Sequence, residues 1–325
     1  MSFLKKFGQR SRERAFTDRA NREQDPDSVL ADDDDRDPFS VNITGTLDLT
    51  IPDDESNNAT TPTYDAQSPH LLPLNVDPPG TVHVAFEVTS AEVIKDQRSS
   101  YVLYTILVSS SSGVERLPTT VDRRYSDFEK LNSVLRKKHP HIMEDVSFPR
   151  KLLVGNFSSE TIAHRSRAFE QYLSHVFSVY ELRYSNELAA FFYLNDAKEG
   201  YSLLCSEQYL EAISLFEKCL PVCEKLYGGG HLRVVSLLHA LVVCYHAIEK
   251  LNKAQKYAEV ALKSANDPVV DEPSIALIKL SIRLCWSLGK DKQDLEKRLQ
   301  ELKARKINVD NVPDLKDIVK LKTLV

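Results

Sequence analysis

The sequence predicts an α+β domain with a three-stranded antiparallel sheet and a helical subdomain, followed by an all-α helical array and preceded by a disordered tail. Three observations lead to this fold class. Apolar residues alternate with polar ones from Thr81 to Tyr125, as on half-buried strands. From Asp127 onward they recur every three or four residues, as on helices. The first 80 residues are rich in charge, proline and small polar residues, and such a segment cannot bury enough apolar area to offset its ordering entropy.

Length and composition restrict the class of protein. A chain of 325 residues with 42% hydrophobic content and a net charge of −5 is typical of a soluble protein of about two domains. No apolar run approaches the ~20 residues that span a bilayer, so we expect any membrane contact to be peripheral and cytosolic. The five cysteines all lie in the last third of the chain, among helix-like apolar residues. Their odd number argues against a disulfide framework, and no histidine forms a zinc-like pattern with them, so we expect reduced, buried thiols and no metal.

The tail changes its charge along its length. Residues 1 to about 24 are basic, and both a short amphipathic helix on anionic lipid and a disordered tail fit them; a single apolar turn favours disorder. Residues 25 to about 80 are acidic, with four consecutive aspartates at Asp32–Asp35. Within them, Val41–Ile51 alternates apolar and polar residues. This island could be a motif that orders on a partner or an accidental strand-like run.

The ordered part divides at about residue 195, with an α+β domain over 81–195 and a helical array over 196–325. Stretches with strand-like alternation lie at 81–88, 102–108 and 114–125, with a flexible tip at 109–113 and an interruption at Pro118. Apolar stripes predict helices over 127–138, 159–180 and 186–194. Ser126 or Asp127 can cap the first of these helices, and Ser158 or Ser159 the second.

Arg123-Arg124-Tyr125-Ser126-Asp127-Phe128 gives the first indication of a binding site. Guanidinium groups at a strand end offer planar donor forks that suit phosphate oxygens, and an aromatic ring beside them offers a flat face. A surface strand end with Tyr125 and Phe128 packed inward is the alternative. Two further basic clusters could converge with this one over the same end of the sheet: Arg150 with Lys151, and His164, Arg165 and Arg167.

An apolar loop adjoins these cations. Leu152, Leu153, Val154 and Phe157 follow Lys151 directly. A basic pocket bordered by an exposed apolar loop suits a phosphorylated lipid headgroup in a membrane, where the loop would insert. The alternative is that the loop folds back onto the core.

Together these residues resemble a PX (phox-homology) domain, the phosphoinositide-binding module of the sorting nexins. The resemblance implies that Arg124 holds a 3-phosphate and that Tyr125 stacks under the inositol ring. It also implies that Lys151 meets the 1-phosphate and that Arg165 bonds the 4- and 5-hydroxyls. Phosphatidylinositol 3-phosphate is therefore the first expected ligand. Arg123, Arg150, His164 and Arg167 are auxiliary cations that could admit bis-phosphorylated headgroups.

The last 130 residues contain a weak internal repeat. Gly200, Tyr209, Ala212, Phe216 and Cys219 form a frame whose second half recurs about forty residues later, at Tyr245, Leu251, Ala254, Ala258 and Ala261. Small residues where antiparallel helices cross resemble tetratricopeptide hairpins. Gly228-Gly229-Gly230 marks a break between helices, Pro268 and Pro273 bracket a linker, and one amphipathic helix is expected after Pro313. A PX domain followed by such an array is similar to the sorting nexins with a C-terminal PX-associated B domain.

The resemblance implies a non-enzymatic membrane adaptor on the cytosolic face of early endosomes, active in intracellular protein transport. The α+β domain would bind the lipid, and the helical array would recruit an unidentified protein partner. A helical scaffold with weak or bis-phosphate-directed lipid binding is the alternative. No kinase or lipase motif set is present, so we expect no enzyme and no cofactor. The near-neutral ordered part and the acidic tail argue against nucleic-acid binding. The lack of a long heptad repeat predicts a monomer.

Overall fold

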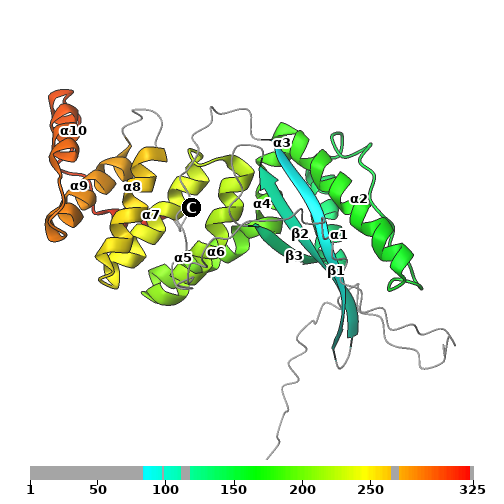
Figure 1. Cartoon of the computed structure of the whole chain (residues 1–325). Coiled ribbons are helices and arrows are strands. Elements are labelled where there is room, and N and C mark those ends of the chain that lie inside the picture. The colour runs from blue at the N-terminus through cyan, green and yellow to red at the C-terminus, as the bar shows by residue number, and fades with distance from the viewer. Residues whose placement is uncertain (1–82, 97–98, 111–117, 265–270, 323–325) are drawn as a thin grey trace, which may run out of the picture.

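The computed structural model describes residues 83–96, 99–110, 118–264 and 271–322 of the chain (Figure 1). The predicted tail over 1–80, with its Val41–Ile51 island, lies outside the described residues, and so does most of the hairpin tip expected at 109–113.

The predicted three-stranded antiparallel sheet is confirmed, with its strands in the order β1-β2-β3. Strands β1 (Val84–Asp96) and β2 (Ser99–Ser110) are longer than their alternating patterns predict, with a bulge between Val88 and Ser90. Strand β3 (Thr120–Arg124) is shorter than predicted and begins only after Pro118. The prediction that Tyr125 ends this strand was wrong, because the first helix begins there.

Two long helices, α1 (Tyr125–Lys138) and α2 (Ser159–Ser178), enclose an aromatic core with the sheet. The rings of Phe128 and Phe169 stack with their centroids 3.7 Å apart, and Tyr104 from β2 meets Phe169 edge-on at 5.0 Å. Ser158 caps α2, as predicted, by accepting a hydrogen bond from the Thr161 N–H at 3.2 Å. This core fixes the start of α1 relative to the sheet.

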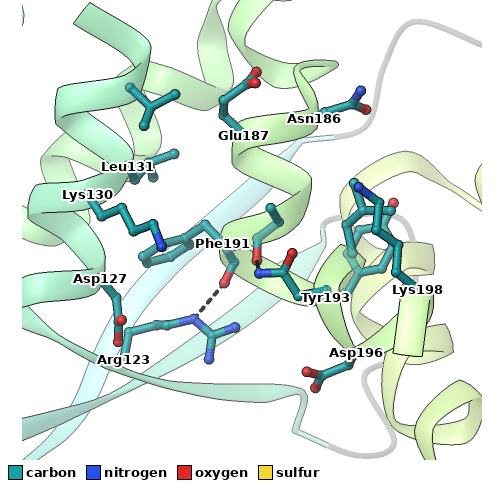
Figure 2. Close-up of a pocket in the computed structure, with 14 residues that line it drawn as sticks. Arg123, Asp127, Lys130, Leu131, Asn186, Glu187, Phe191, Tyr193, Asp196 and Lys198 are labelled. Atoms are coloured by element: carbon teal, nitrogen blue, oxygen red, sulfur yellow. Dashed lines mark hydrogen bonds between the residues drawn. The ribbon is translucent and has the colours of Figure 1, made fainter. Parts of the chain in front are cut away.

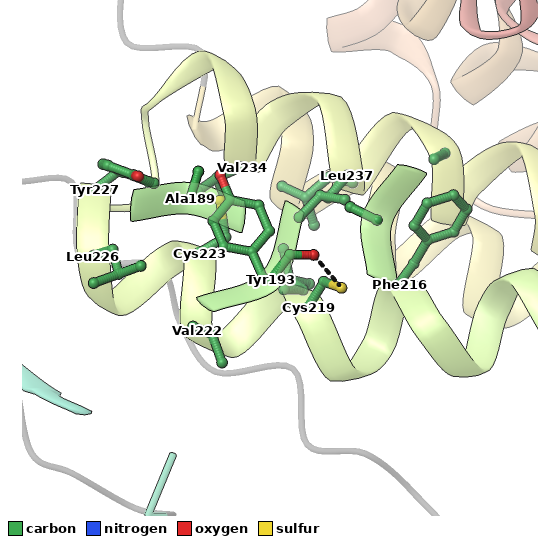
Figure 3. Close-up of a cluster of buried hydrophobic side chains, with 14 of the residues drawn as sticks. Ala189, Tyr193, Phe216, Cys219, Val222, Cys223, Leu226, Tyr227, Val234 and Leu237 are labelled. Carbon is green, nitrogen blue, oxygen red and sulfur yellow. Dashed lines mark hydrogen bonds between the residues drawn. The ribbon is translucent and has the colours of Figure 1, made fainter. Parts of the chain in front are cut away.

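A continuous helical segment joins the two parts of the chain. After the single turn α3 (Tyr180–Arg183), helix α4 (Asn186–Ala189) leads into a π-helical turn, η1 (Ala190–Leu194), and then into α5 (Asn195–Cys205). Figure 3 shows Tyr193 of η1 among side chains of α6 (Tyr209–Tyr227) and α7 (Leu232–Ala247). The Tyr193 carbonyl accepts the Cys219 S–H at 3.5 Å. The helix and the core therefore both continue across residue 195.

Between residues 195 and 304, the described part of the chain forms an array of three helical hairpins, which follow one another away from the sheet (Figure 1). They pair α5 with α6, α7 with α8 (Leu251–Ser264), and α9 (Glu272–Ser287) with α10 (Gln293–Ala304). Gly200 lies at a close crossing, since a Cβ there would approach the Phe216 ring to 2.8 Å. Gly228 follows α6 with a positive φ of 79°. Of the two prolines predicted to bracket a linker, Pro268 lies outside the described residues, and Pro273 lies in the first turn of α9, where a proline begins the helix.

The final helix, α11 (Leu315–Lys322), forms where the amphipathic pattern predicts it. Four of the five cysteines are buried as predicted, but Cys205 at the end of α5 is exposed. Burial raises the pKa of Cys223 and Cys244 to about 12, so both thiols stay protonated. Among the described residues, no helix is both long and apolar enough to span a bilayer, and no cluster of side chains could hold a metal ion.

Candidate lipid-headgroup site

The strand-to-helix junction positions Arg124. It is the last residue of β3, and its N–H donates to the Asp127 carboxylate at 2.8 Å, which places an acidic group in the first turn of α1. The sequence predicted Ser126 or Asp127 as the N-cap of this helix. Both residues instead lie within its first turn, where the Asp127 side chain accepts the Arg124 N–H. The Arg124 guanidinium carbon lies 4.4 Å from the ring centroid of Tyr101 on β2. This cation–π contact holds a half-buried arginine at the sheet end.

Tyr125 is buried beneath the loop that carries Lys151. Its hydroxyl donates to the Pro149 carbonyl at 3.0 Å, and only 1% of its surface is exposed. The guanidinium carbon of Arg165 lies 4.3 Å from the centroid of its ring. In this conformation a cation therefore lies over the ring that was expected to face inositol.

Arg165 is a buried cation whose hydrogen bonding is incomplete. It is 2% exposed, and its Nη2 donates to the Asn156 amide oxygen at 2.7 Å. Its Nε atom is buried without a hydrogen-bond partner among the described residues. A buried guanidinium that lacks a carboxylate partner retains much of its desolvation cost. Arg165 is therefore suited to receive an anion or a hydroxyl group.

Asn156, which the sequence analysis did not single out, connects Arg165 to the loop. This side chain is 8% exposed, and its Nδ2 donates to the Leu152 carbonyl at 3.0 Å. No sequence signal indicates this role, because the burial of Asn156 is visible only in the structure. The consequence is that Arg165 and the loop from Pro149 to Asn156 are held in one hydrogen-bonded unit.

The apolar loop is exposed at its tip. Leu152, Leu153 and Val154 are 41%, 94% and 83% exposed, and Arg150 and Lys151 beside them are exposed as well. Phe157 was wrongly grouped with these residues, because it packs against the core. It precedes the Ser158 N-cap, and Ile162, which also packs against the core, lies at the N4 position. These are the two positions of a hydrophobic staple.

The Arg123 side chain points toward the π-helical turn η1, whereas that of Arg124 lies over Tyr101. Its Nε donates to the Phe191 carbonyl at 2.5 Å, its Nη2 to the Phe192 carbonyl at 3.1 Å, and its Nη1 to the Asp122 carbonyl at 2.6 Å. Figure 2 shows this side chain reaching the π-helical turn. Burial lowers the pKa of Arg123, and nearby carboxylates including Asp127 oppose that shift. The auxiliary role predicted for Arg123 is corrected here to a structural one. His164 and Arg167 are exposed on α2.

Sequence reasoning missed a cleft of about 560 Å³ on the Arg123 side (Figure 2). Side chains from α1, α4, η1 and α5 line it, including Lys130 and Lys198. Its acidic residues are largely paired within the fold: Glu187 bonds to Lys138, and Asp196 to Lys218 at 2.7 Å. Residues this far apart in sequence meet only after folding, so no local pattern indicates the cleft.

Comparisons with known proteins give matches to both parts of the chain. A family model of the PX domain matches residues 112–195, and one of a tetratricopeptide repeat matches residues 197–267. Sorting nexin-21 of Homo sapiens is 33% identical over 332 residues, which cover 91% of this chain and 89% of that protein. Sorting nexin-20 of Bos taurus is 33% identical over 225 residues, which cover 69% and 71%. A solved mouse SNX19 PX domain with bound sulphate ion is 21% identical, with a TM-score of 0.29, and covers 34% of this chain and 97% of its own.

The chain thus combines a PX domain with a tetratricopeptide-like helical region. With a third of its residues identical over nearly the full length of a known member, it belongs to the sorting nexin family. This combination in a sorting nexin indicates a membrane-associated trafficking adaptor.

Proposed function

We propose that this chain is a phosphoinositide-binding peripheral membrane adaptor of endosomal sorting. The proposal rests above all on Arg165, a buried guanidinium with an unpartnered Nε beside Tyr125. A charged group in this state is stabilised by a ligand that supplies oxygen acceptors. The ligand we infer is phosphatidylinositol 3-phosphate on the cytosolic face of early endosomes, with the chain acting as a monomer and without enzymatic activity.

Each pocket residue has a proposed role. Arg124 bonds the 3-phosphate, Lys151 the 1-phosphate, and Arg165 the 4- and 5-hydroxyls, while the Tyr125 ring packs against the sugar. Arg165 now lies over that ring, so the bound state requires the guanidinium and the loop from Pro149 to Asn156 to move together. The exposed cations Arg150, His164 and Arg167 are available for a second phosphate.

The loop tip adds a second, apolar contribution to membrane binding. Full burial of a leucine or valine side chain in hydrocarbon contributes roughly 1.5–3 kcal/mol, and anionic lipid attracts the neighbouring lysine and arginine by about 1 kcal/mol each. Leu153 and Val154 are the most exposed apolar side chains of the loop. Two weak attachments of this kind bind better together than either does alone.

We assign residues 81–195 to lipid binding and residues 196–325 to recruitment of a protein partner, with residues 1–80 as the tail. The second candidate is a helical scaffold for which lipid is only a secondary anchor. The Tyr125 ring is the observation that favours this candidate, because it is 1% exposed and Arg165 covers the face that would meet a sugar.

Vesicle co-sedimentation of the full chain across a phosphoinositide panel separates the two candidates. The variants are Arg124→Ala and, as a control with the same charge change on an exposed site, Arg305→Ala. The adaptor function predicts selective pelleting with the 3-phosphate that only Arg124→Ala abolishes. Equal, salt-sensitive pelleting of all three proteins on any anionic lipid would support the scaffold and contradict the pocket.

A further inference from the structure

Helix α11 does not extend the helical array but crosses it. It contacts α5, α7 and α9, which are the first helices of the three hairpins. A helix that continued the stack would instead pack on the last hairpin, as each repeat does on its neighbour. We call the surface of α5, α7 and α9 that contacts this helix the α11 face.

An apolar stripe and a basic pair hold α11 in place. Leu315, Ile318 and Val319, at helical positions i, i+3 and i+4, are between 1% and 7% exposed. Lys316 and Lys320 both place their Nζ atoms on Glu207, at 3.0 and 3.1 Å. Exposed ion pairs of this kind contribute little to stability, so the apolar stripe supplies most of the attraction and the lysines set the register.

The α11 face is larger than α11 itself. A groove of about 740 Å³ continues beside the helix, bounded by side chains of α5, α7, α9 and α11. Leu321 of α11 and Leu232 of α7 line this groove and are 61% and 64% exposed. A longer helix, or one with a larger apolar stripe, would cover this remaining surface as well.

The segment that precedes α11 keeps it near the face whether or not it is docked. Residues 305–314 contain no helix or strand, and they cross α9, where Lys279 donates to the Val312 carbonyl at 3.1 Å. Val309 and Val312 in this segment are buried. A helix tethered in this way experiences an effective concentration in the millimolar range, so it competes strongly with any free ligand.

We propose that the α11 face is the partner-binding surface of the array, and that α11 occupies it as a competing intramolecular ligand. The partner segment has the chemistry of α11: a short amphipathic helix with apolar residues at i, i+3 and i+4 and two lysines one turn apart facing Glu207. This inference rests on the adaptor function proposed above and identifies the class of its protein partner. Its test uses no lipid, so the two proposals fail separately.

The test uses the full chain with a protease site inserted between Arg305 and Lys306, both exposed, so that α11 can be detached without deleting it. The probe is a fluorescent peptide that copies residues 311–322. Fluorescence anisotropy should show binding to the cleaved chain, and at least tenfold weaker binding to the uncleaved chain. An Ile318→Asp peptide should not bind, whereas a peptide changed at the exposed Asp317 to Asn should bind normally.

A second measurement keeps the result unambiguous. Gel filtration of the diluted, cleaved chain should show loss of the C-terminal fragment, with the circular dichroism of the remaining helices retained. Retention of the fragment without exchange for the probe would show that α11 is a permanent part of the core. Loss of the array's helicity on release of the fragment would do the same. Either outcome would overturn the proposal.

Discussion

Two regions of this molecule each place an arginine over a tyrosine ring, and they differ in how many hydrogen bonds the guanidinium makes to the protein. The PX domain places Arg165 over Tyr125, and the junction between sheet and array places Arg233 over Tyr227, with distances from guanidinium carbon to ring centroid of 4.3 and 5.2 Å. At the junction, Arg233 donates to the Tyr227 hydroxyl, the Tyr184 carbonyl and the Asn186 amide, each at 3.0 Å. In the PX domain, Arg165 makes one such bond to the part of the chain that the structure describes, and its Nε has no partner there.

The difference shows that an arginine–aromatic contact alone does not indicate whether the arginine is structural or binds a ligand. Where a guanidinium donates to three oxygens of the fold, as that of Arg233 does, the pair connects two elements and contributes to stability. Where a donor is buried without an acceptor, the fold retains a cost that a ligand can remove. The number of satisfied donors therefore separates structural arginines from candidate binding arginines.

Arg123→Ala should produce the largest effect. The variant removes two hydrogen bonds from the charged guanidinium to the Phe191 and Phe192 carbonyls of the π-helical turn, and hydrogen bonds to charged groups contribute about 1.5–3 kcal/mol each. We expect a loss of about 2–4 kcal/mol in the free energy of unfolding, measured by urea titration. Arg124→Ala should leave this quantity within about 1 kcal/mol of the parent value. Equal destabilisation by the two variants would remove the distinction between the neighbours.

The double variant Leu153→Asp, Val154→Asp should follow. Loss of both exposed apolar side chains and the introduction of two negative charges should weaken vesicle binding by about tenfold or more. Binding of a soluble, short-chain phosphatidylinositol 3-phosphate, measured by calorimetry, should not change. Leu210→Asp on α6, where the leucine is 62% exposed, is the control for a charged substitution at an exposed leucine. An equal loss with this control would exclude a specific loop insertion.

Asn156→Asp should have a smaller effect, and the effect concerns binding of the headgroup and not insertion of the loop. The aspartate keeps an acceptor for Arg165 but adds a charge that satisfies the guanidinium from within the protein. We expect about fivefold weaker binding of the soluble headgroup. Asn156→Ala, which releases Arg165, should bind the soluble headgroup at least as well as the parent. A stronger headgroup interaction in the aspartate variant would contradict the assignment of Arg165 as an acceptor-seeking cation.

The smallest effect concerns pH and lies on α6, one turn before Tyr227. Burial raises the pKa of Glu224 from 4.5 to about 7, with Lys225 opposing the shift. Between these values the folded state binds more protons than the unfolded state, so stability falls as pH rises from about 4.5 to about 7. Glu224→Gln should flatten that slope and raise the Tm at pH 8 by about 2–6 °C, measured by differential scanning fluorimetry. An unchanged slope would mean that Glu224 does not titrate in this window.

The sequence predicted elements well and side-chain directions poorly. Alternation and helical spacing predicted the three strands, the capped helix α2 and helix α11, because each follows from a local period. Arg123 and Arg124 are adjacent residues of the same type, so the sequence does not distinguish their roles. Successive residues of a strand point to opposite faces, and only the fold shows that the face of Arg123 meets the π-helical turn. Phe157 could have been predicted to pack inward, since it precedes the serine cap of α2.

The unbroken segment from Asn186 to Cys205 also has a mechanical consequence. A rod without a hinge transmits rotation, so tilting the sheet end through an angle turns the helical hairpins through a similar angle. The sheet end and the helical hairpins are therefore expected to move together, and not as two domains on a flexible linker. Whatever surface the sheet end rests on, the height and direction at which the hairpins project from it are set by the hydrogen-bonded helix from Asn186 to Cys205, without the freedom of a linker.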